Sequence, residues 1–249
     1  MKRKIQRLGM TEGNYAACAK GLKVQTRRRM NPQPGHLDHR VSLVDPDRGR
    51  PGVWRQWIDR RCDGKGEVEY DYNSPTWRPR YAVGDIAGLT LPHYRQATPV
   101  GGTVLRGTSA CVWDEITRCH RTRSTKWPPA DLNVTYRWRR MAARYMPVWA
   151  CLHRVEIVGV RAEQLGEISA EDCMAEGITG TPDAVDPLDG GAAPYGAWYY
   201  PGDCVDYPDP LYAYAIEWIA LHGAGSWDPE TWVWVYDFKL RPKAKETDA

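Results

Sequence analysis

The distribution of charge along the chain is the sequence feature that most constrains its fold. Residues 1–161 hold 30 basic and 14 acidic side chains, a net charge of +16. Residues 162–238 hold 15 acidic side chains and no Lys or Arg, so the whole chain of 249 residues has a net charge of only +3. This division predicts that part of the basic charge pairs with the acidic part inside the protein. The remaining basic side chains favour a polyanionic partner such as a nucleic acid.

Composition excludes several classes of protein. The chain is long enough to bury a core, as one large domain or two small ones. With 42% hydrophobic residues and 12 Trp it is not a disordered polyelectrolyte. We expect no membrane interaction, because no stretch approaches the roughly 18 apolar residues that span a bilayer. The basic N-terminus lacks the apolar region of a signal peptide, and the seven cysteines are scattered without a CxxC pair, which favours reduced thiols and a cytoplasmic location.

Regular elements are predicted at well-separated places in the chain. Hydrophobic periodicity and capping residues indicate helices at 13–21, from Ser169 to Gly177, and at 211–221, and strands at 149–160 and 231–238. The stretches 36–80, 92–132 and 179–210 are polar or rich in Gly and Pro, which is typical of long irregular insertions. This order of elements predicts an α+β fold with a small barrel or curled sheet.

Four segments resemble the ASCH superfamily, in the order in which that family has them. They are GLKVQTRR at 21–28, YAVGD at 81–85, the stretch 146–178, and GAGSWDPETWVWVYDFK at 223–239. The signature is most similar to bacteriophage-encoded members, although the Arg-Glu-Thr-Trp that commonly follows the Gly-Asp is missing from Ile86–Leu91. The resemblance implies a PUA-like β-barrel with short flanking helices, as a single domain over 1–249. Its core segments would be about 8–34, 81–91, 133–178 and 211–240, with insertions at about 35–80, 92–132 and 179–210.

The same resemblance implies a pocket for RNA or modified bases. One bacterial branch of the superfamily hydrolyses N4-acetylcytidine with a Lys, a Thr three residues later and a distant Glu. Lys23, Thr26 and Glu176 stand at those positions, with Cys173 where alanine is usual. The implied roles are Thr26 as nucleophile, Lys23 as base, and Glu176 as acid or orienting carboxylate.

The spacing of Lys23 and Thr26 sets a condition on those roles. Residues i and i+3 meet on a helical turn but fall on opposite faces of a strand, so the pair can cooperate only if the segment after Gly21 is a turn or a helix end. The simpler interpretation is that Lys23 and Thr26 contact phosphates and that Glu176 caps a helix or neutralises a basic neighbour.

Two basic clusters, at residues 1–30 and 118–144, predict contact with nucleic acid. Arginines beside flat aromatic side chains suit phosphate binding and base stacking, whereas the alternative is a solvated surface that offsets the acidic part. The residues predicted to make this contact are Arg27, Arg28, Arg29, Arg137, Arg139, Arg140 and Arg144. Trp227, in a Gly-Ser-Trp-Asp turn, is predicted to line the pocket.

A metal site is the weaker hypothesis. Cys111, Cys119 and His120 could supply three ligands, and His36 with His39 could supply two, but none has the paired spacing of a zinc site, so we expect no metal and no cofactor. The sequence thus favours a protein that binds a nucleobase, a nucleoside or RNA (or DNA), with hydrolysis of an N4-acyl group on cytidine as an attached activity. The alternative is a non-catalytic phage accessory protein that binds nucleic acid or a host protein through its basic face.

Overall fold

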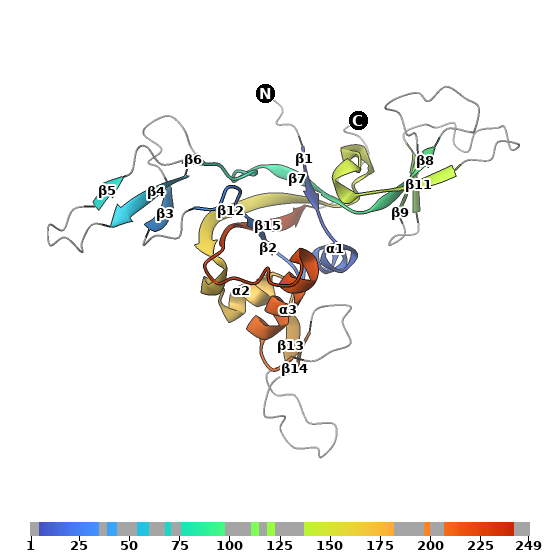
Figure 1. Ribbon diagram of the computed structural model, residues 1–249. Helices are drawn as coiled ribbons and strands as arrows, with labels where there is room; N and C mark the ends of the chain where they lie inside the picture. The colour runs from blue at the N-terminus through green and yellow to red at the C-terminus, as the bar shows by residue number, and fades with distance from the viewer. Residues whose placement is uncertain are drawn as a thin grey trace, which may run out of the picture. The chain divides into compact units, whose positions relative to one another are not determined.

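The computed structural model describes residues 5–34, 39–43, 54–59, 68–70, 76–97, 111–114, 119–122, 137–181, 197–199 and 207–241 (Figure 1). The chain forms two compact units. Unit 1 is Met1–Ala19, Ile86–Glu156 and Leu240–Ala249, and unit 2 is Lys20–Asp85 and Ile157–Lys239. The prediction of a single domain stays a prediction. Within the described residues no helix is long and apolar enough to cross a membrane.

The fold is of the mixed α+β class, as predicted. Its α-helices are α1 (Glu12–Ala19), α2 (Ala170–Ala175) and α3 (Pro210–His222). A five-stranded sheet has the order β1 (Gln6–Gly9), β7 (Ile86–Thr90), β12 (Arg154–Gln164), β15 (Trp232–Arg241) and β2 (Gln25–Arg29). β1 pairs with β7 in parallel, whereas β7 with β12 and β15 with β2 are antiparallel. The first three residues of β12 belong to unit 1 and the rest to unit 2.

Unit 1 contains β1, β7 and α1, followed by a second sheet. That sheet has the order β10 (Cys119–Thr122), β9 (Cys111–Asp114), β8 (His93–Ala97) and β11 (Arg137–Met141). Short 3-10 helices at η3 (Ala143–Tyr145) and η4 (Val148–Ala150) lead back to β12. A hydrogen bond of 2.8 Å between the Tyr15 hydroxyl and Nδ1 of His153 joins α1 to the chain just before β12.

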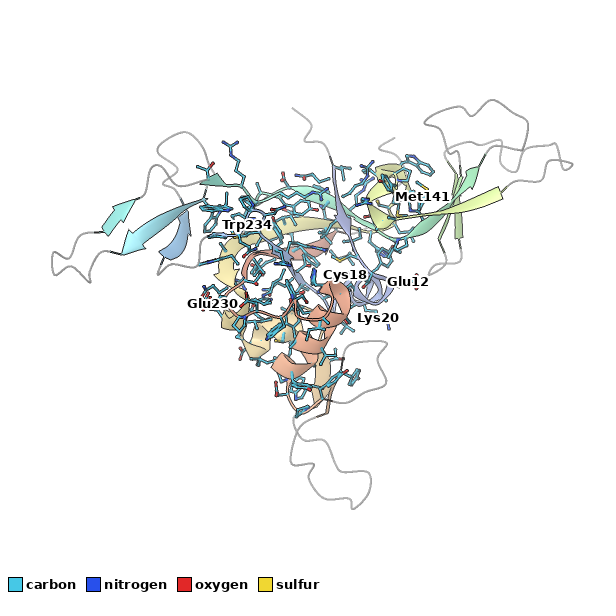
Figure 2. The ribbon with its side chains drawn as sticks, viewed as in Figure 1. Glu12, Cys18, Lys20, Met141, Glu230 and Trp234 are labelled. Carbon is cyan, nitrogen blue, oxygen red and sulfur yellow. The ribbon has the colours of Figure 1, made fainter. Side chains whose placement is uncertain are left out.

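Unit 2 is built around an apolar core between β15, α2 and α3. Val233 and Val235 point from one face of β15 into a cluster with Cys173 of α2 and with Tyr214 and Trp218 of α3. Figure 2 draws these side chains and labels Trp234, which alternation places on the other face of the same strand. The two helices therefore cover one face of β15, and the aromatic residues of the strand share the opposite face: Trp232, Trp234, Tyr236 and Phe238.

The helix boundaries in unit 2 follow from the capping residues. Ser169 Oγ accepts a hydrogen bond of 3.1 Å from the Asp172 amide at the start of α2, as the sequence predicts. Asp209 caps α3 in the same way, and Pro210 occupies its first turn. Gly223 ends α3 with a φ of +97°, a conformation that residues with a Cβ rarely adopt.

The stretches predicted to be irregular contain additional strands. Strands β8, β9 and β10 lie within 92–132, where the sequence predicts none. In 36–80 and 179–210 the strands are β3 (His39–Leu43), β4 (Trp54–Asp59), β5 (Val68–Tyr70), β6 (Thr76–Trp77), β13 (Thr179–Thr181) and β14 (Ala197–Tyr199). These strands are short and largely polar, so they lack the alternating hydrophobic pattern that identifies a half-buried strand. The predicted strand at 149–160 instead begins at Arg154 and continues to Gln164.

Close packing at η5 (Leu165–Glu167) generates a stability prediction. A Cβ on Gly166 would lie 2.7 Å from Cβ and 3.1 Å from Cα of Pro229, a rigid neighbour. We expect Gly166→Ala to lower the free energy of unfolding by about 1–3 kcal/mol, as overpacking typically does. Urea unfolding followed by tryptophan fluorescence measures this change. Gly9→Ala is the control, because its Cβ would meet only ordinary contacts at 3.7 and 3.8 Å; equal effects of the two substitutions would contradict the prediction.

Candidate charged site on strand β2

Strand β2 brings several charged side chains into unit 2. The pairing between β2 and β15 continues to Val24, one residue before β2, because the Val24 carbonyl accepts a hydrogen bond of 2.8 Å from the Phe238 amide. The Val24 amide donates a second hydrogen bond, also of 2.8 Å, to the Ala175 carbonyl at the end of α2. Side chains of an extended segment alternate between its two faces. Lys23, Gln25 and Arg27 therefore share one face, and Thr26 is on the other.

Lys23 forms a buried ion pair with Glu176. Nζ of Lys23 donates to Oε2 of the Glu176 carboxylate and, at 2.6 Å, to the backbone carbonyl of the same residue. Lys23 is 4% exposed and Glu176 is 3% exposed. Glu176 is the C-cap of α2, and Gly177 follows it with a φ of +106°, so the turn that ends the helix places this carboxylate beside Lys23.

Arg27 connects this pair to two further carboxylates. Its Nη1 lies 3.2 Å from Oε1 of Glu176, its Nε donates to Oε1 of Glu163 at 2.8 Å, and its Nη2 lies 2.9 Å from Oδ2 of Asp172. The Arg27 guanidinium also lies 5.9 Å from the ring centre of Tyr214. Burial acts to lower the pKa of Arg27, but the charges of Glu176 and Glu163 outweigh it and raise the pKa above its ordinary value. The side chain is therefore buried with its full charge.

Arg161 and Asp237 form the more exposed edge of the same group, and the buried side chain of Gln25 contacts this edge. Arg161 contacts Asp172 at 2.9 Å and Asp237 at 3.0 Å, and Nε2 of Gln25 donates to the same two carboxylates at 2.9 and 2.7 Å. Arg161 and Asp237 are 37% and 35% exposed, so their ion pair is accessible to water. We refer to the eight residues as the charge cluster: Lys23, Gln25, Arg27, Arg161, Glu163, Asp172, Glu176 and Asp237.

The structure brings together two of the three residues predicted to be catalytic. Lys23 and Glu176 are in contact, although 153 positions separate them in the sequence. Thr26 lies opposite Tyr236 of β15 and is buried, and alternation points it away from Lys23. No interaction within the described part of the chain joins Thr26 to either partner. The catalytic roles stay a prediction.

The arginines predicted to bind nucleic acid differ in their surroundings. The side chain of Arg27 is fully buried against three carboxylates, and its predicted contact with nucleic acid stays a prediction. On the same strand Arg28 is half-buried and Arg29 is exposed. Arg144 is exposed, and its guanidinium lies 5.1 Å from the ring centre of Tyr145. The remaining three lie on β11, where the structure does not describe their side chains: Arg137, Arg139 and Arg140.

Trp227 is half-buried and packs against the core of unit 2. Its ring centre lies 6.1 Å from that of Tyr214 in an edge-on arrangement. Tyr214 in turn lies beside the Arg27 guanidinium. Tyr214 thus contacts both Trp227 and the charge cluster. That Trp227 lines a pocket stays a prediction.

Five members of the charge cluster were not predicted from the sequence: Gln25, Arg161, Glu163, Asp172 and Asp237. One signal could have identified some of them. Lys23, Gln25 and Arg27 recur at every second position, as do Arg161 and Glu163, and polar residues with that period share one face of a strand. Asp237, by contrast, gives no such signal within its apolar surroundings.

The described residues contain no group of three His, Cys, Asp or Glu side chains that could hold a metal ion. Cys111, Cys119 and His120 lie on β9 and β10, and His39 lies on β3. His36 lies outside the described residues. The thiols of Cys18, Cys151 and Cys173 form no disulfide, and burial raises the pKa of Cys173 to about 12, so that side chain stays a neutral thiol.

Comparison with known proteins gives no relative. No protein-family model matches this sequence, and no curated protein or solved structure is significantly similar to it. The geometry of the charge cluster is therefore the main basis for a functional proposal.

The charge cluster predicts that stability falls in acid. Burial acts to raise the pKa of Asp172, but the hydrogen bond from Gln25 and the charges of Arg27 and Arg161 outweigh it and lower the pKa below its ordinary value. The ionised carboxylate therefore contributes its full stabilisation above about pH 4, where an unfolded Asp is also ionised. This stabilisation is lost as the pH falls through the lowered pKa that Asp172 has in the folded protein.

We expect Asp172→Asn to unfold at a lower urea concentration than wild type at pH 7, with the difference narrowing below about pH 4. Urea unfolding at a series of pH values measures this. Glu171→Gln, one position earlier on an exposed part of α2, is the matched control and leaves the profile unchanged. A difference between Asp172→Asn and wild type that stays constant down to pH 2 would contradict the assignment.

Proposed function

We propose that this chain is an ASCH-type protein with a PUA-like core that binds a nucleobase, a nucleoside or RNA through Lys23 and Glu176. The observation that carries this proposal is the buried contact between those two side chains. The sequence resemblance assigns both residues to one site, from segments 153 positions apart, and the two meet. Their contact supports the shared site without depending on a shared reaction.

The chemistry of the pair suits the edge of a cytosine-like base. Such an edge presents a carbonyl oxygen, which accepts hydrogen bonds, and an exocyclic amine, which donates them. Lys23 is a donor and the Glu176 carboxylate is an acceptor, so together they complement that pattern. Within a protein interior, where water competes little, each such hydrogen bond is stronger than at an exposed surface.

Access to the pair requires a local movement. Lys23 and Glu176 are only 4% and 3% exposed, so a base reaches them only when a neighbouring side chain is displaced. The exposed edge of the charge cluster at Arg161 and Asp237 shows that the group as a whole is not sealed from water.

Hydrolysis of an N4-acyl group on cytidine is a second candidate function. The Lys23–Glu176 contact favours it, because the resemblance assigns both residues to that reaction. In the reaction, Thr26 Oγ1 would attack the acyl carbonyl carbon while Lys23, as base, takes the hydroxyl proton. The bond from that carbon to N4 would then break, and N4 would take this proton from Lys23. Water would then release the acyl group from Thr26 as a carboxylic acid. Since Thr26 is on the opposite face of β2, this route needs a rearrangement of the strand end that binding alone does not need.

Binding of cytidine and N4-acetylcytidine tests the main proposal. We expect Lys23→Ala and Glu176→Gln each to weaken binding by about tenfold or more, the usual cost of losing a hydrogen bond to a charged group. Isothermal titration calorimetry measures the affinities. The matched controls are Lys20→Ala and Glu171→Gln, which change exposed residues of the same types nearby and leave affinity unchanged. Wild-type protein that binds neither nucleosides nor a short single-stranded RNA would refute the proposal.

Turnover of N4-acetylcytidine tests the second candidate. Chromatography of the reaction products detects cytidine and acetate released by the purified protein. If the chain is a hydrolase, Lys23→Ala and Thr26→Ala both abolish release, and the loss with Thr26→Ala shows that Thr26 reaches the substrate. If the wild type binds N4-acetylcytidine but releases no cytidine or acetate, the hydrolase hypothesis is wrong for this substrate.

The salt dependence of RNA binding separates the proposal from binding through a basic face. We expect Arg29→Ala and Arg144→Ala each to reduce the slope of log affinity against log salt concentration by about the amount that one phosphate contact contributes. Filter binding of single-stranded RNA and DNA at several salt concentrations measures the slope. Salt-sensitive binding that is the same in Lys23→Ala as in wild type would favour the accessory protein with a basic binding face.

A further inference from the structure

Both oxygens of the Glu176 carboxylate accept hydrogen bonds from cationic groups. Oε2 faces the Lys23 ammonium and Oε1 faces the Arg27 guanidinium, 3.2 Å away. Both ends of this carboxylate are therefore occupied as hydrogen-bond acceptors by buried cationic side chains. Of the two roles that the sequence leaves open, acid or orienting carboxylate, this geometry favours the orienting one.

Arg27 is itself fixed from several sides. Glu163 of β12 and Asp172 of α2 bind its other nitrogens, and the ring of Tyr214 lies against the guanidinium. A guanidinium presents its donors in a rigid plane, so three carboxylates around that plane leave it little freedom to turn. Arg27 therefore fixes the position of the Glu176 carboxylate.

Lys23 keeps one donor for another group. An ammonium has three N–H groups, and Lys23 uses two of them on the carboxylate and the carbonyl of Glu176. Within the described part of the chain no acceptor is seen for the third. An acceptor atom on a bound ligand would take this third hydrogen bond.

We propose that Arg27 is the positioning residue of this site. By holding the Glu176 carboxylate in place, it orients Lys23 and directs the third N–H of Lys23 at a carbonyl oxygen of the ligand, such as the C2 carbonyl of a cytosine. This inference rests on the proposed function, and it names the ligand atom that Lys23 recognises. Arg27 does not touch the ligand; it acts through Glu176.

The test compares two arginines of the charge cluster. Arg27→Gln removes the contact with Glu176, whereas Arg161→Gln removes an arginine that shares Asp172 and Glu163 with Arg27 but does not contact Glu176. We expect Arg27→Gln to weaken cytidine binding by about tenfold to a hundredfold and Arg161→Gln to leave it within about twofold. Calorimetry measures both affinities, after circular dichroism has shown that each variant is folded.

A second measurement is independent of any ligand. The ¹H–¹⁵N signal of the Lys23 ammonium, assigned by its loss in Lys23→Met, reports whether the group is held in place and shielded from exchange with water. We expect this signal in wild type and in Arg161→Gln, and its loss in Arg27→Gln. Where Arg27→Gln does not fold, Arg27→Lys replaces it, because a single ammonium keeps the charge but cannot bridge Glu163 and Glu176 together.

The outcomes separate the two proposals. If wild type binds no nucleoside and the signals behave as expected, the binding function fails while the positioning role of Arg27 stands. If the Lys23 signal and the affinity are unchanged in Arg27→Gln, or if Arg161→Gln lowers both as much as Arg27→Gln does, Arg27 has no specific positioning role and the inference is overturned.

Discussion

Burial of the Arg27 charge is the constraint on which unit 2 depends. A guanidinium with no exposed side-chain surface is stable only when carboxylates compensate for the lost water, and removal of one buried partner costs several kcal/mol. Its three carboxylates come from β12, from the first turn of α2 and from the end of α2. The position of α2 relative to β2 and β12 is therefore set by charge as well as by the apolar core under β15 and α3.

Local signals in the sequence were sufficient to predict several elements. Ser169 and Gly223 mark helix ends because a hydroxyl or a positive φ is needed there, and both residues do this in the structure. The α+β class follows from such elements. The contact of Lys23 with Glu176 is different, because only the resemblance to a family connects residues so far apart; their local surroundings indicate no more than a basic loop and an acidic helix end.

Features that depend on strand pairing could not be predicted. Whether Lys23 and Thr26 cooperate depends on whether the chain is extended at that point, and its pairing with the end of β15 decides this. The same register brings Gln25 beside Asp237, a contact across 212 positions. The polar strands of 92–132 give no pattern of their own, because neither of their faces carries a continuous apolar stripe.

The division of charge along the sequence has a consequence for the order of folding during synthesis. Lys23 and Arg27 leave the ribosome before Glu163, Asp172 and Glu176, which follow more than 130 residues later, and β15 is synthesised after all of them. Until then β2 has neither its carboxylates nor its neighbouring strand. Pairing between strands that lie far apart in the sequence is slow. While a strand edge is unpaired, it can form non-native contacts. The arginines of β2 reduce this risk, since repulsion between like charges keeps two nascent copies from pairing along that edge.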